Sequence, residues 1–276
     1  MDRIRLIASD MDATLLDEQS QLPADFEETI HALAELGIRF APASGRPLYT
    51  LEAMFPTLQD ELVFIGDNGG AIRWKGQNLF TSEMSPEGWR ALNRLTREQG
   101  DIAVLCGLES AYVERPFAVH DAVLRHFYTK IEYVDRLEDV TAPADKFTIY
   151  LPQHNAQQAY DTVYASQRSI YSVAVAGECW VDIMNPGVHK GTALQTLGQL
   201  WGLPSESMMA FGDTYNDAEM LQTVRYGFLM ENGSEPLRQK VPFLAPSHRE
   251  AGVMQILQKV LAQNGFVCPA DFAPAH

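Results

Sequence analysis

The sequence has few cysteines and no long apolar run. Its three cysteines, Cys106, Cys179 and Cys268, form neither an even-numbered disulfide framework nor a metal-binding spacing, which favours a reducing compartment. No stretch approaches the roughly 20 apolar residues that a membrane-spanning helix needs. The short apolar run near the N-terminus lacks the length and the cleavage site of a signal peptide. We therefore expect a cytoplasmic protein without a membrane segment.

Basic residues are also scarce. Twenty-one lysines and arginines stand against 36 aspartates and glutamates, which gives a formal net charge of −15. Such a charge repels both a nucleic-acid backbone and an anionic membrane surface, so we expect neither as a partner. It would equally repel a phosphorylated metabolite. A phosphate site in this chain would therefore need a local cation.

Both ends of the chain alternate between strand-like and helix-like patterns. Apolar runs of strand length occur at residues 6–8, 38–43, 62–65 and 208–211. Helical spacing of apolar residues occurs at 26–36, between Pro23 and Gly37, and again at 191–200. This alternation predicts an α/β fold with a Rossmann-like parallel sheet covered by helices.

The middle of the chain has a different texture. Helical stretches at 86–99 and 156–166 lie between alternating strands at 102–105, 147–151 and 180–183, without polar loops at the strand ends. This pattern predicts an inserted α+β cap domain over residues 84–186, with a hairpin arm at 171–178. Residues 1–83 and 187–276 would form the core, and residues 265–276 are expected to be a loose tail.

Polar side chains cluster where predicted parallel strands end, which is the edge where open α/β sheets bind ligands. Residues 10–14 follow the first strand, 44–46 follow the second, and 212–217 follow the strand at 208–211. Residues 189–191 open the helix before that strand. The candidate set comprises four carboxylates, a hydroxyl, an amine and an amide: Asp10, Asp12, Asp213, Asp217, Ser44, Lys190 and Asn216. Oxygen ligands of this kind suit Mg²⁺ shared with a substrate phosphate, so the set predicts a magnesium site beside a phosphate site.

Each of these groups also has an ordinary structural explanation. The pattern Asp-x-Asp-x-Thr recurs by chance, and Ser44–Gly45 could be a simple turn. Lys190 could be a solvated lysine, and Asp213 and Asp217 could cap a helix. The occurrence of all four groups in this order, each beside the same predicted sheet edge, favours a functional site.

At this point the chain resembles the haloacid-dehalogenase superfamily, in its Cof-type branch. The matching segments span nearly the whole chain and are Ser9–Leu16, Ala43–Arg46, Asn68–Gly69, His189–Leu194 and Gly212–Leu221. Residues 106–113 are similar to the cap, of the C2 type, of bacterial sugar phosphatases in that branch. The resemblance implies a phosphoric monoester hydrolase acting on small phosphorylated metabolites, with sugar phosphates leading and cofactor precursors or nucleotides behind.

The resemblance also implies roles for the two aspartates that follow the first strand. Asp10 would attack phosphorus and carry the phosphoryl group, and Asp12 would be the general acid and base. Mg²⁺ would be held by Asp10, Asp213 and the backbone carbonyl of Asp12.

The remaining candidates would bind phosphate or support the site. Ser44 and Lys190 would hold phosphoryl oxygens, while Asn216 and Asp217 would orient the metal's waters or Lys190. Gly45 and Arg46 are candidate substrate contacts, although Arg46 could equally pair with a neighbouring carboxylate.

The sequence departs from the family pattern at Ala13, where glycine is usual. An alanine there costs about 1 kcal/mol or somewhat more if its φ is positive. Three other functions stay open at this stage. The chain could be a phosphomutase or phosphotransferase of the same fold, or a binding protein that has lost turnover. A receiver domain also uses an aspartate and Mg²⁺, but the inserted domain and the paired aspartates do not suit it.

Overall fold

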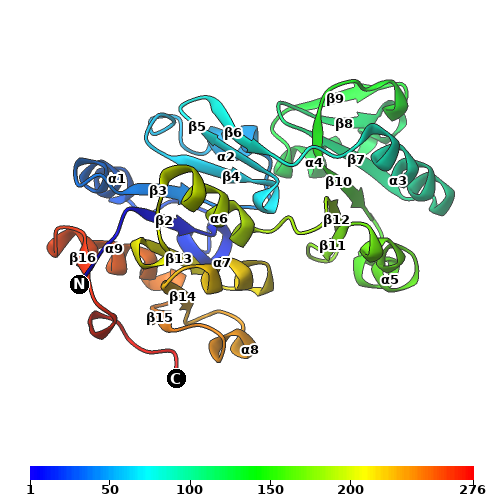
Figure 1. Cartoon of the computed structure of the whole chain (residues 1–276). Helices are drawn as coiled ribbons and strands as arrows, with labels where there is room; N and C mark the ends of the chain where they lie inside the picture. The colour runs from blue at the N-terminus through cyan, green and yellow to red at the C-terminus, as the bar shows by residue number, and fades with distance from the viewer.

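The computed structural model describes residues 1–276 and consists of two bodies joined by two segments (Figure 1). The larger body is built around a five-stranded parallel sheet with the order β15-β14-β13-β2-β3. Its strands are β2 (Leu6–Ser9), β3 (Arg39–Pro42), β13 (Met208–Gly212), β14 (Tyr226–Met230) and β15 (Phe243–Ala245). Nearly all of their residues are buried, as expected for a parallel sheet covered on both faces. The prediction of an α/β fold with a parallel sheet is confirmed.

Helices cover the two faces of this sheet. On one face, α1 (Phe26–Glu35) and α9 (Gly252–Ala262) contribute to the largest apolar cluster. On the other face, α6 (Lys190–Trp201) and α7 (Ala218–Thr223) pack in a second cluster. Gly37 reverses the chain after α1 with a φ of 73°, a conformation that glycine adopts without strain.

A small antiparallel sheet extends this body beyond β3. It consists of β4 (Val63–Gly66), β5 (Ala71–Trp74) and β6 (Gln77–Thr81), preceded by the short helix α2 (Leu48–Ala53). The apolar run at 62–65 does form a strand, but it pairs with β5. An isolated parallel bridge between Ala43 and Ile65 connects it to the end of β3.

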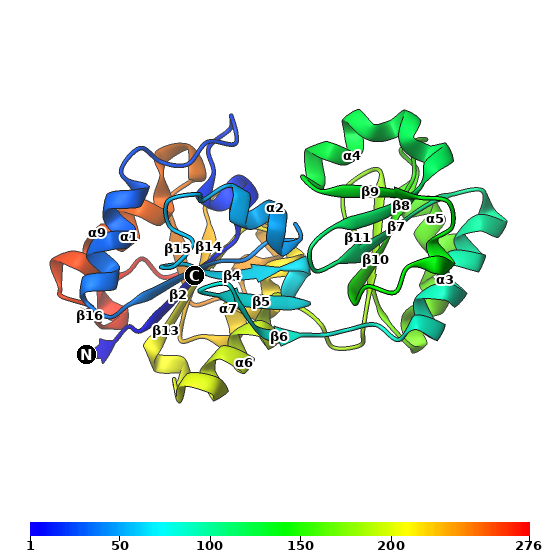
Figure 2. The same ribbon diagram turned by 90° about the horizontal axis from the view of Figure 1, so that it is seen from above.

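The smaller body contains a six-stranded sheet with the order β11-β12-β10-β7-β8-β9. Its elements in chain order are α3 (Pro86–Gln99), β7 (Ile102–Gly107), β8 (Ala111–Glu114), α4 (Asp121–Phe127), β9 (Ile131–Val134), β10 (Ala144–Tyr150), α5 (Ala156–Thr162), β11 (Ser172–Val175) and β12 (Trp180–Met184). All its strand pairs are antiparallel except β8 with β9. The view from above shows this sheet facing the end of the larger body (Figure 2).

The two connecting segments are held together by one side chain. The Asn185 amide donates hydrogen bonds to the backbone carbonyls of Ser82 and Glu83, at 3.2 and 2.8 Å. The chain therefore enters and leaves the smaller body at one place.

The expectation of a loose C-terminal tail is wrong. Strand β16 (Phe266–Val267) pairs with β1 (Asp2–Arg3), and Val267, Phe272 and Ala275 are buried. The tail closes the edge of the parallel sheet beyond β15, where Leu244 donates a backbone hydrogen bond to Ala273. None of the helices is both long and apolar enough to cross a membrane.

Candidate active site

The carboxyl ends of three adjacent strands bring the predicted polar residues together. Asp10 follows β2, Ser44 lies just beyond β3, and Asp213 follows β13, so all three lie at one edge of the sheet. The Asp10 amide donates to the carbonyl of Phe211 in the neighbouring strand at 3.0 Å, which fixes the start of the loop. All three residues are buried.

Lys190 supplies the local cation that the acidic composition demands. It is the first residue of α6, behind an N-cap in which the His189 ring nitrogen accepts from the Thr192 amide at 3.2 Å. The Lys190 side chain is fully buried, and its Nζ lies 2.5 Å from Asp10 Oδ1 and 2.7 Å from Asp217 Oδ1. One ammonium thus joins two carboxylates that are far apart in the sequence.

Asp217 is held from both sides. While Oδ1 accepts from Lys190, Oδ2 accepts from the backbone amides of Asp213 and Thr214 at 3.0 and 3.2 Å. A Cβ on Gly212 would lie 2.4 Å from the Cβ of Asp217, so only glycine fits at that position. Asp217 therefore does cap the turn after β13, and in the same position it contacts Lys190.

Three carboxylates meet at this point. Asp10, Asp213 and Asp217 each present an oxygen within 4.8 Å of the others. Burial raises the pKa of Asp10 to about 7, despite the opposing effect of Lys190, and raises the pKa of Asp213 to about 6. When all three carboxyls are ionised, the single ammonium leaves an excess of two negative charges. This donor set fits a divalent cation that prefers oxygen ligands, such as Mg²⁺.

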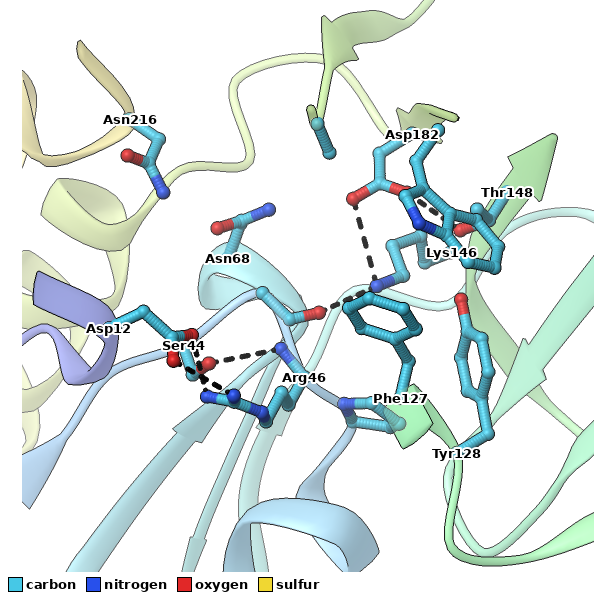
Figure 3. A pocket seen from close by; sticks show the side chains of 14 residues that line it. Asp12, Ser44, Arg46, Asn68, Phe127, Tyr128, Lys146, Thr148, Asp182 and Asn216 are labelled. Atoms are coloured by element: carbon cyan, nitrogen blue, oxygen red, sulfur yellow. Dashed lines mark hydrogen bonds and ion pairs between the residues drawn. The ribbon is translucent and has the colours of Figure 1, made fainter. Parts of the chain in front are cut away.

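Asp12 points away from that cluster. Its side chain is 61% exposed, and both of its carboxylate oxygens face the Arg46 guanidinium at 2.8 and 3.0 Å (Figure 3). The backbone turns directly after Asp12, at Ala13, whose φ is 56°. Ala13 therefore occupies the left-handed region in which glycine is usual, and its carbonyl accepts a hydrogen bond from Asn232 at 2.9 Å. Of the two readings of Arg46, the structure shows the contact with a neighbouring carboxylate.

The loops after β3 and β4 support each other. The Ser44 hydroxyl accepts from the Arg46 amide at 3.2 Å, and the Asn68 amide nitrogen of the backbone donates to the Ser44 carbonyl at 2.9 Å. The Asn68 side chain packs directly on Gly45, where a Cβ would lie 3.2 Å from Asn68 Nδ2. Asn216 is exposed, and its Oδ1 accepts from the Thr214 hydroxyl at 2.5 Å. Asn216 does not contact Lys190, unlike Asp217.

A cavity of about 210 Å³ lies between the two bodies, beside this cluster. The larger body lines it with Asp12, Ser44, Gly45, Arg46, Asn68 and Asn216, and the smaller body with Phe127, Tyr128, Lys146, Thr148, Trp180 and Asp182. Figure 3 shows these two sets of side chains on opposite sides of the cavity. The sequence predicts the site residues of the first set, although it gives Asn68 no role. It predicts none of the second set. The one available signal was the charged pair Asp145–Lys146 inside an otherwise apolar strand.

Lys146 crosses from the smaller body to the larger one. Its Nζ donates to the Gly45 carbonyl at 2.7 Å and lies 2.8 Å from Asp67 Oδ1, while Asp182 Oδ2 lies 3.8 Å away. Although burial itself opposes the charge, the carboxylates of Asp182 and Asp67 raise the pKa of Lys146 well above its ordinary value. The ammonium is therefore fully charged and already paired.

Comparisons with known proteins agree with this geometry. The family model for haloacid dehalogenase-like hydrolases matches residues 7–257. The chain is 31% identical over 262 residues to the 5-amino-6-(5-phospho-D-ribitylamino)uracil phosphatase YbjI of Escherichia coli K12, covering 94% of this chain and 96% of that protein. It is 30% identical over 249 residues to the HMP-PP phosphatase of Cronobacter sakazakii, covering 87% and 89%. Among solved structures, SMU.1108c from Streptococcus mutans superposes with a TM-score of 0.82 at 28% identity, covering 94% of this chain and 99% of that one.

Proposed function

This chain belongs to the haloacid dehalogenase-like hydrolases, as a phosphatase of that superfamily, and we propose that it hydrolyses small phosphorylated metabolites through a phosphoryl group carried on Asp10. One observation carries the proposal. Asp10 lies beside a buried lysine and two further carboxylates, next to a cavity whose near wall holds Asp12 and Ser44. This set contains a nucleophile, a proton carrier and phosphate ligands within one site.

In the first step, a carboxylate oxygen of Asp10 attacks phosphorus as the bond from phosphorus to the ester oxygen breaks. Lys190 engages Oδ1 of Asp10, which leaves Oδ2 as the attacking atom. The departing alkoxide takes a proton from Asp12, whose exposed side chain reaches the cavity. The products of this step are the free alcohol and an aspartyl-phosphate.

In the second step, a water molecule attacks phosphorus of the aspartyl-phosphate. Asp12 takes the proton of this water, and the bond from phosphorus to the Asp10 oxygen breaks, which releases inorganic phosphate. We propose that the Ser44 hydroxyl and Lys190 hold the phosphoryl oxygens and that Asp217 orients the lysine. The position of Ser44 in the cavity wall and the contacts of Lys190 with Asp10 and Asp217 support these roles.

A bound Mg²⁺ would neutralise charge between the carboxylate and the phosphoryl group, and we propose Asp10, Asp213 and the backbone carbonyl of Asp12 as its protein ligands. Asp217 belongs to the same acidic cluster, but Lys190 and two backbone amides already occupy its oxygens. Because its oxygens are occupied, we propose that Asp217 orients Lys190 and does not bind the metal directly. Asn216 faces the cavity from the same loop.

We propose that residues 84–186 act as a cap that shields the aspartyl-phosphate and selects the substrate, over a core of residues 1–83 and 187–276. The side chains of this segment that line the cavity support this assignment. The two relatives described above are named as phosphatases, and the substrate in one of these names is a uracil that carries a phosphoribitylamino group. Metabolites of that size, including sugar phosphates, are the proposed substrates.

The test is phosphate release from a panel of phosphorylated metabolites. We expect release without any added acceptor, abolished by a chelator and restored by Mg²⁺ better than by Ca²⁺. Folded Asp10→Asn protein should be inactive on every substrate. Release that persists in excess chelator would remove the metal from the proposal, and release that requires a sugar acceptor would identify a phosphotransferase.

A further inference from the structure

The charged groups that line the cavity are already paired. The Arg46 guanidinium faces Asp12, and Lys146 is shared among the Gly45 carbonyl, Asp67 and Asp182. The lining carries two cations, Arg46 and Lys146, against two carboxylates, Asp12 and Asp182. Asp67 lies directly behind Lys146 and adds a further acidic group. A second anionic group on a substrate would therefore have to compete with protein groups for cations that are already engaged.

The cap wall of the cavity also presents aromatic rings. The Trp180 ring meets the Phe127 ring edge-on, with 5.0 Å between centroids, and packs against Tyr150 at 4.6 Å. Phe127 is half-buried and lines the same cavity as Lys146 and Arg46 (Figure 3). The rings are thus fixed by one another at an interplanar angle of 67°, and Phe127 and Trp180 both contribute apolar surface to the cavity wall.

Hydrogen-bonding groups lie next to these rings. The Thr148 hydroxyl donates to Asp182 Oδ1 at 2.7 Å, which leaves Asp182 Oδ2 with only the distant Lys146 as a neighbour at 3.8 Å. Asp182 Oδ2 is therefore an acceptor available to a donor on the substrate. A carboxylate in this place attracts hydroxyl or amino groups and repels other carboxylates.

From these contacts we infer that the part of the substrate beyond the phosphate is uncharged, presents a flat ring to Phe127 and Trp180, and donates hydrogen bonds to Asp182. This inference rests on the proposed function, because it concerns the leaving group of the same reaction. It makes monophosphate esters of neutral ring-bearing alcohols the preferred class, and it disfavours substrates with a carboxylate or a second phosphate.

Four synthetic esters test the charge and the ring separately. The 4-carboxybenzyl and 4-carbamoylbenzyl phosphates differ in charge but hardly in shape. Benzyl and cyclohexylmethyl phosphates differ in flatness but not in charge. We expect kcat/KM to be about tenfold or more lower for the carboxylate ester than for the carboxamide ester. Burying an unpaired charge costs more free energy than losing one contact. We expect a preference of about three- to tenfold for benzyl over cyclohexylmethyl, the range of an aromatic contact.

Two variants assign these preferences to residues. Asp182→Asn removes one negative charge while keeping the shape, and should narrow the carboxamide-to-carboxylate ratio about fivefold. Phe127→Leu should bring the benzyl preference close to one. Phe117→Leu is the matched control, because Phe117 packs on the same apolar cluster of the cap but does not line this cavity.

The outcomes separate the two levels of the argument. If folded enzyme with Mg²⁺ releases no phosphate from any of the four esters or from the metabolite panel, the proposed function fails and this inference fails with it. If all four esters are hydrolysed with equal kcat/KM, or the carboxylate is preferred, only the inference is overturned. If Phe117→Leu lowered the benzyl-to-cyclohexylmethyl ratio of kcat/KM as much as Phe127→Leu does, the proposed ring contact would likewise be refuted.

Discussion

The charge of Lys190 should be essential for folding stability as well as for phosphate binding. Its ammonium is fully buried and contacts Asp10 and Asp217, with Asp213 next to both. Lys190→Met keeps the length of the side chain and removes the charge. The variant must then bury three carboxylates without any cation.

Breaking a buried ion pair by removing one partner typically destabilises a protein by about 3–5 kcal/mol, because the remaining charge stays buried and uncompensated. Lys190 serves two partners, so we expect a loss at the upper part of that range at pH 8 in the presence of a chelator. The measurement is the free energy of unfolding from urea denaturation. Lys259→Met is the matched control, since Lys259 is exposed on α9 and should lose little.

The unfolding free energy of Lys190→Met should also change with pH in a definite direction. Burial already raises the pKa of Asp10 to about 7 with the lysine present, and removal of the ammonium raises that pKa further. The folded variant then binds more protons than the unfolded chain, so its stability should increase as the pH falls from 8 towards 6. Adding Asp217→Asn to Lys190→Met should recover part of the loss, because it removes one of the uncompensated charges.

Two results would refute this reasoning. One is a Lys190→Met protein whose unfolding free energy at pH 8 matches that of the Lys259→Met control. The other is a variant that loses further stability on acidification from pH 8 to 6. Either result would mean that the ammonium does not compensate these carboxylates in the folded state.

Three further predictions follow from individual contacts. Ala13→Gly should raise the unfolding free energy by less than about 1 kcal/mol, because relief of the positive φ, about 1–2 kcal/mol, is partly offset by the freer unfolded chain; a lower melting temperature would contradict this. Asp12→Asn treated with nitrophenyl phosphate should accumulate phosphoryl mass on the peptide that contains Asp10, detected by mass spectrometry, and label on a serine or histidine peptide would contradict the assignment. Lys146→Met leaves Asp67 buried without its cation, so proteolysis of the segments near 82 and 185 should become faster, whereas unchanged cleavage would show that this pair does not hold the two bodies together.

The sheet edge could be predicted from the sequence because its signals are local. Each polar loop follows an apolar run of strand length, and parallel strands bring such loops to one edge. The pairing of Lys190 with Asp217 could not be read in this way. It depends on the backbone turn at Gly212, which places Asp217 back under β13.

The C-terminal segment shows where composition misleads. Residues 265–276 contain two prolines and little regular pattern, which is typical of a loose tail. Its few apolar side chains nevertheless fill the sheet edge, where Phe272 meets Phe228 and Phe243 edge-on at 5.0 and 5.7 Å. The edge that accepts them is formed by strands far away in the sequence, so no local pattern could predict the contact.

The cap side of the cavity was missed for a different reason. Lys146 and Asp182 lie within strands of the cap sheet, whereas the sequence pattern predicts binding residues only at strand ends. A β-bulge makes Asp145 an extra residue between Ala144 and Lys146 in the pairing of β10 with β7. Bulges redirect side chains, and this one brings Asp145 and Lys146 together against Asp67.

Two buried lysines, Lys190 and Lys146, are each surrounded by several carboxyl groups, but the two clusters differ in their geometry. Around Lys190, three ionised carboxylates leave two excess negative charges beside an open cavity. This arrangement favours binding of a divalent cation. Around Lys146, burial raises the pKa of Asp67 and raises that of Asp145 well above its ordinary value, and the neighbouring Asp67 carboxylate raises the pKa of Asp145 further. Lys146 Nζ lies 2.8 Å from Asp67 Oδ1 there, and Asp145 is fully buried. Only the Lys190 cluster brings oxygens of three acidic side chains within 4.8 Å of one another, so we expect a divalent cation there, where phosphorus is attacked, and none at the cap contact.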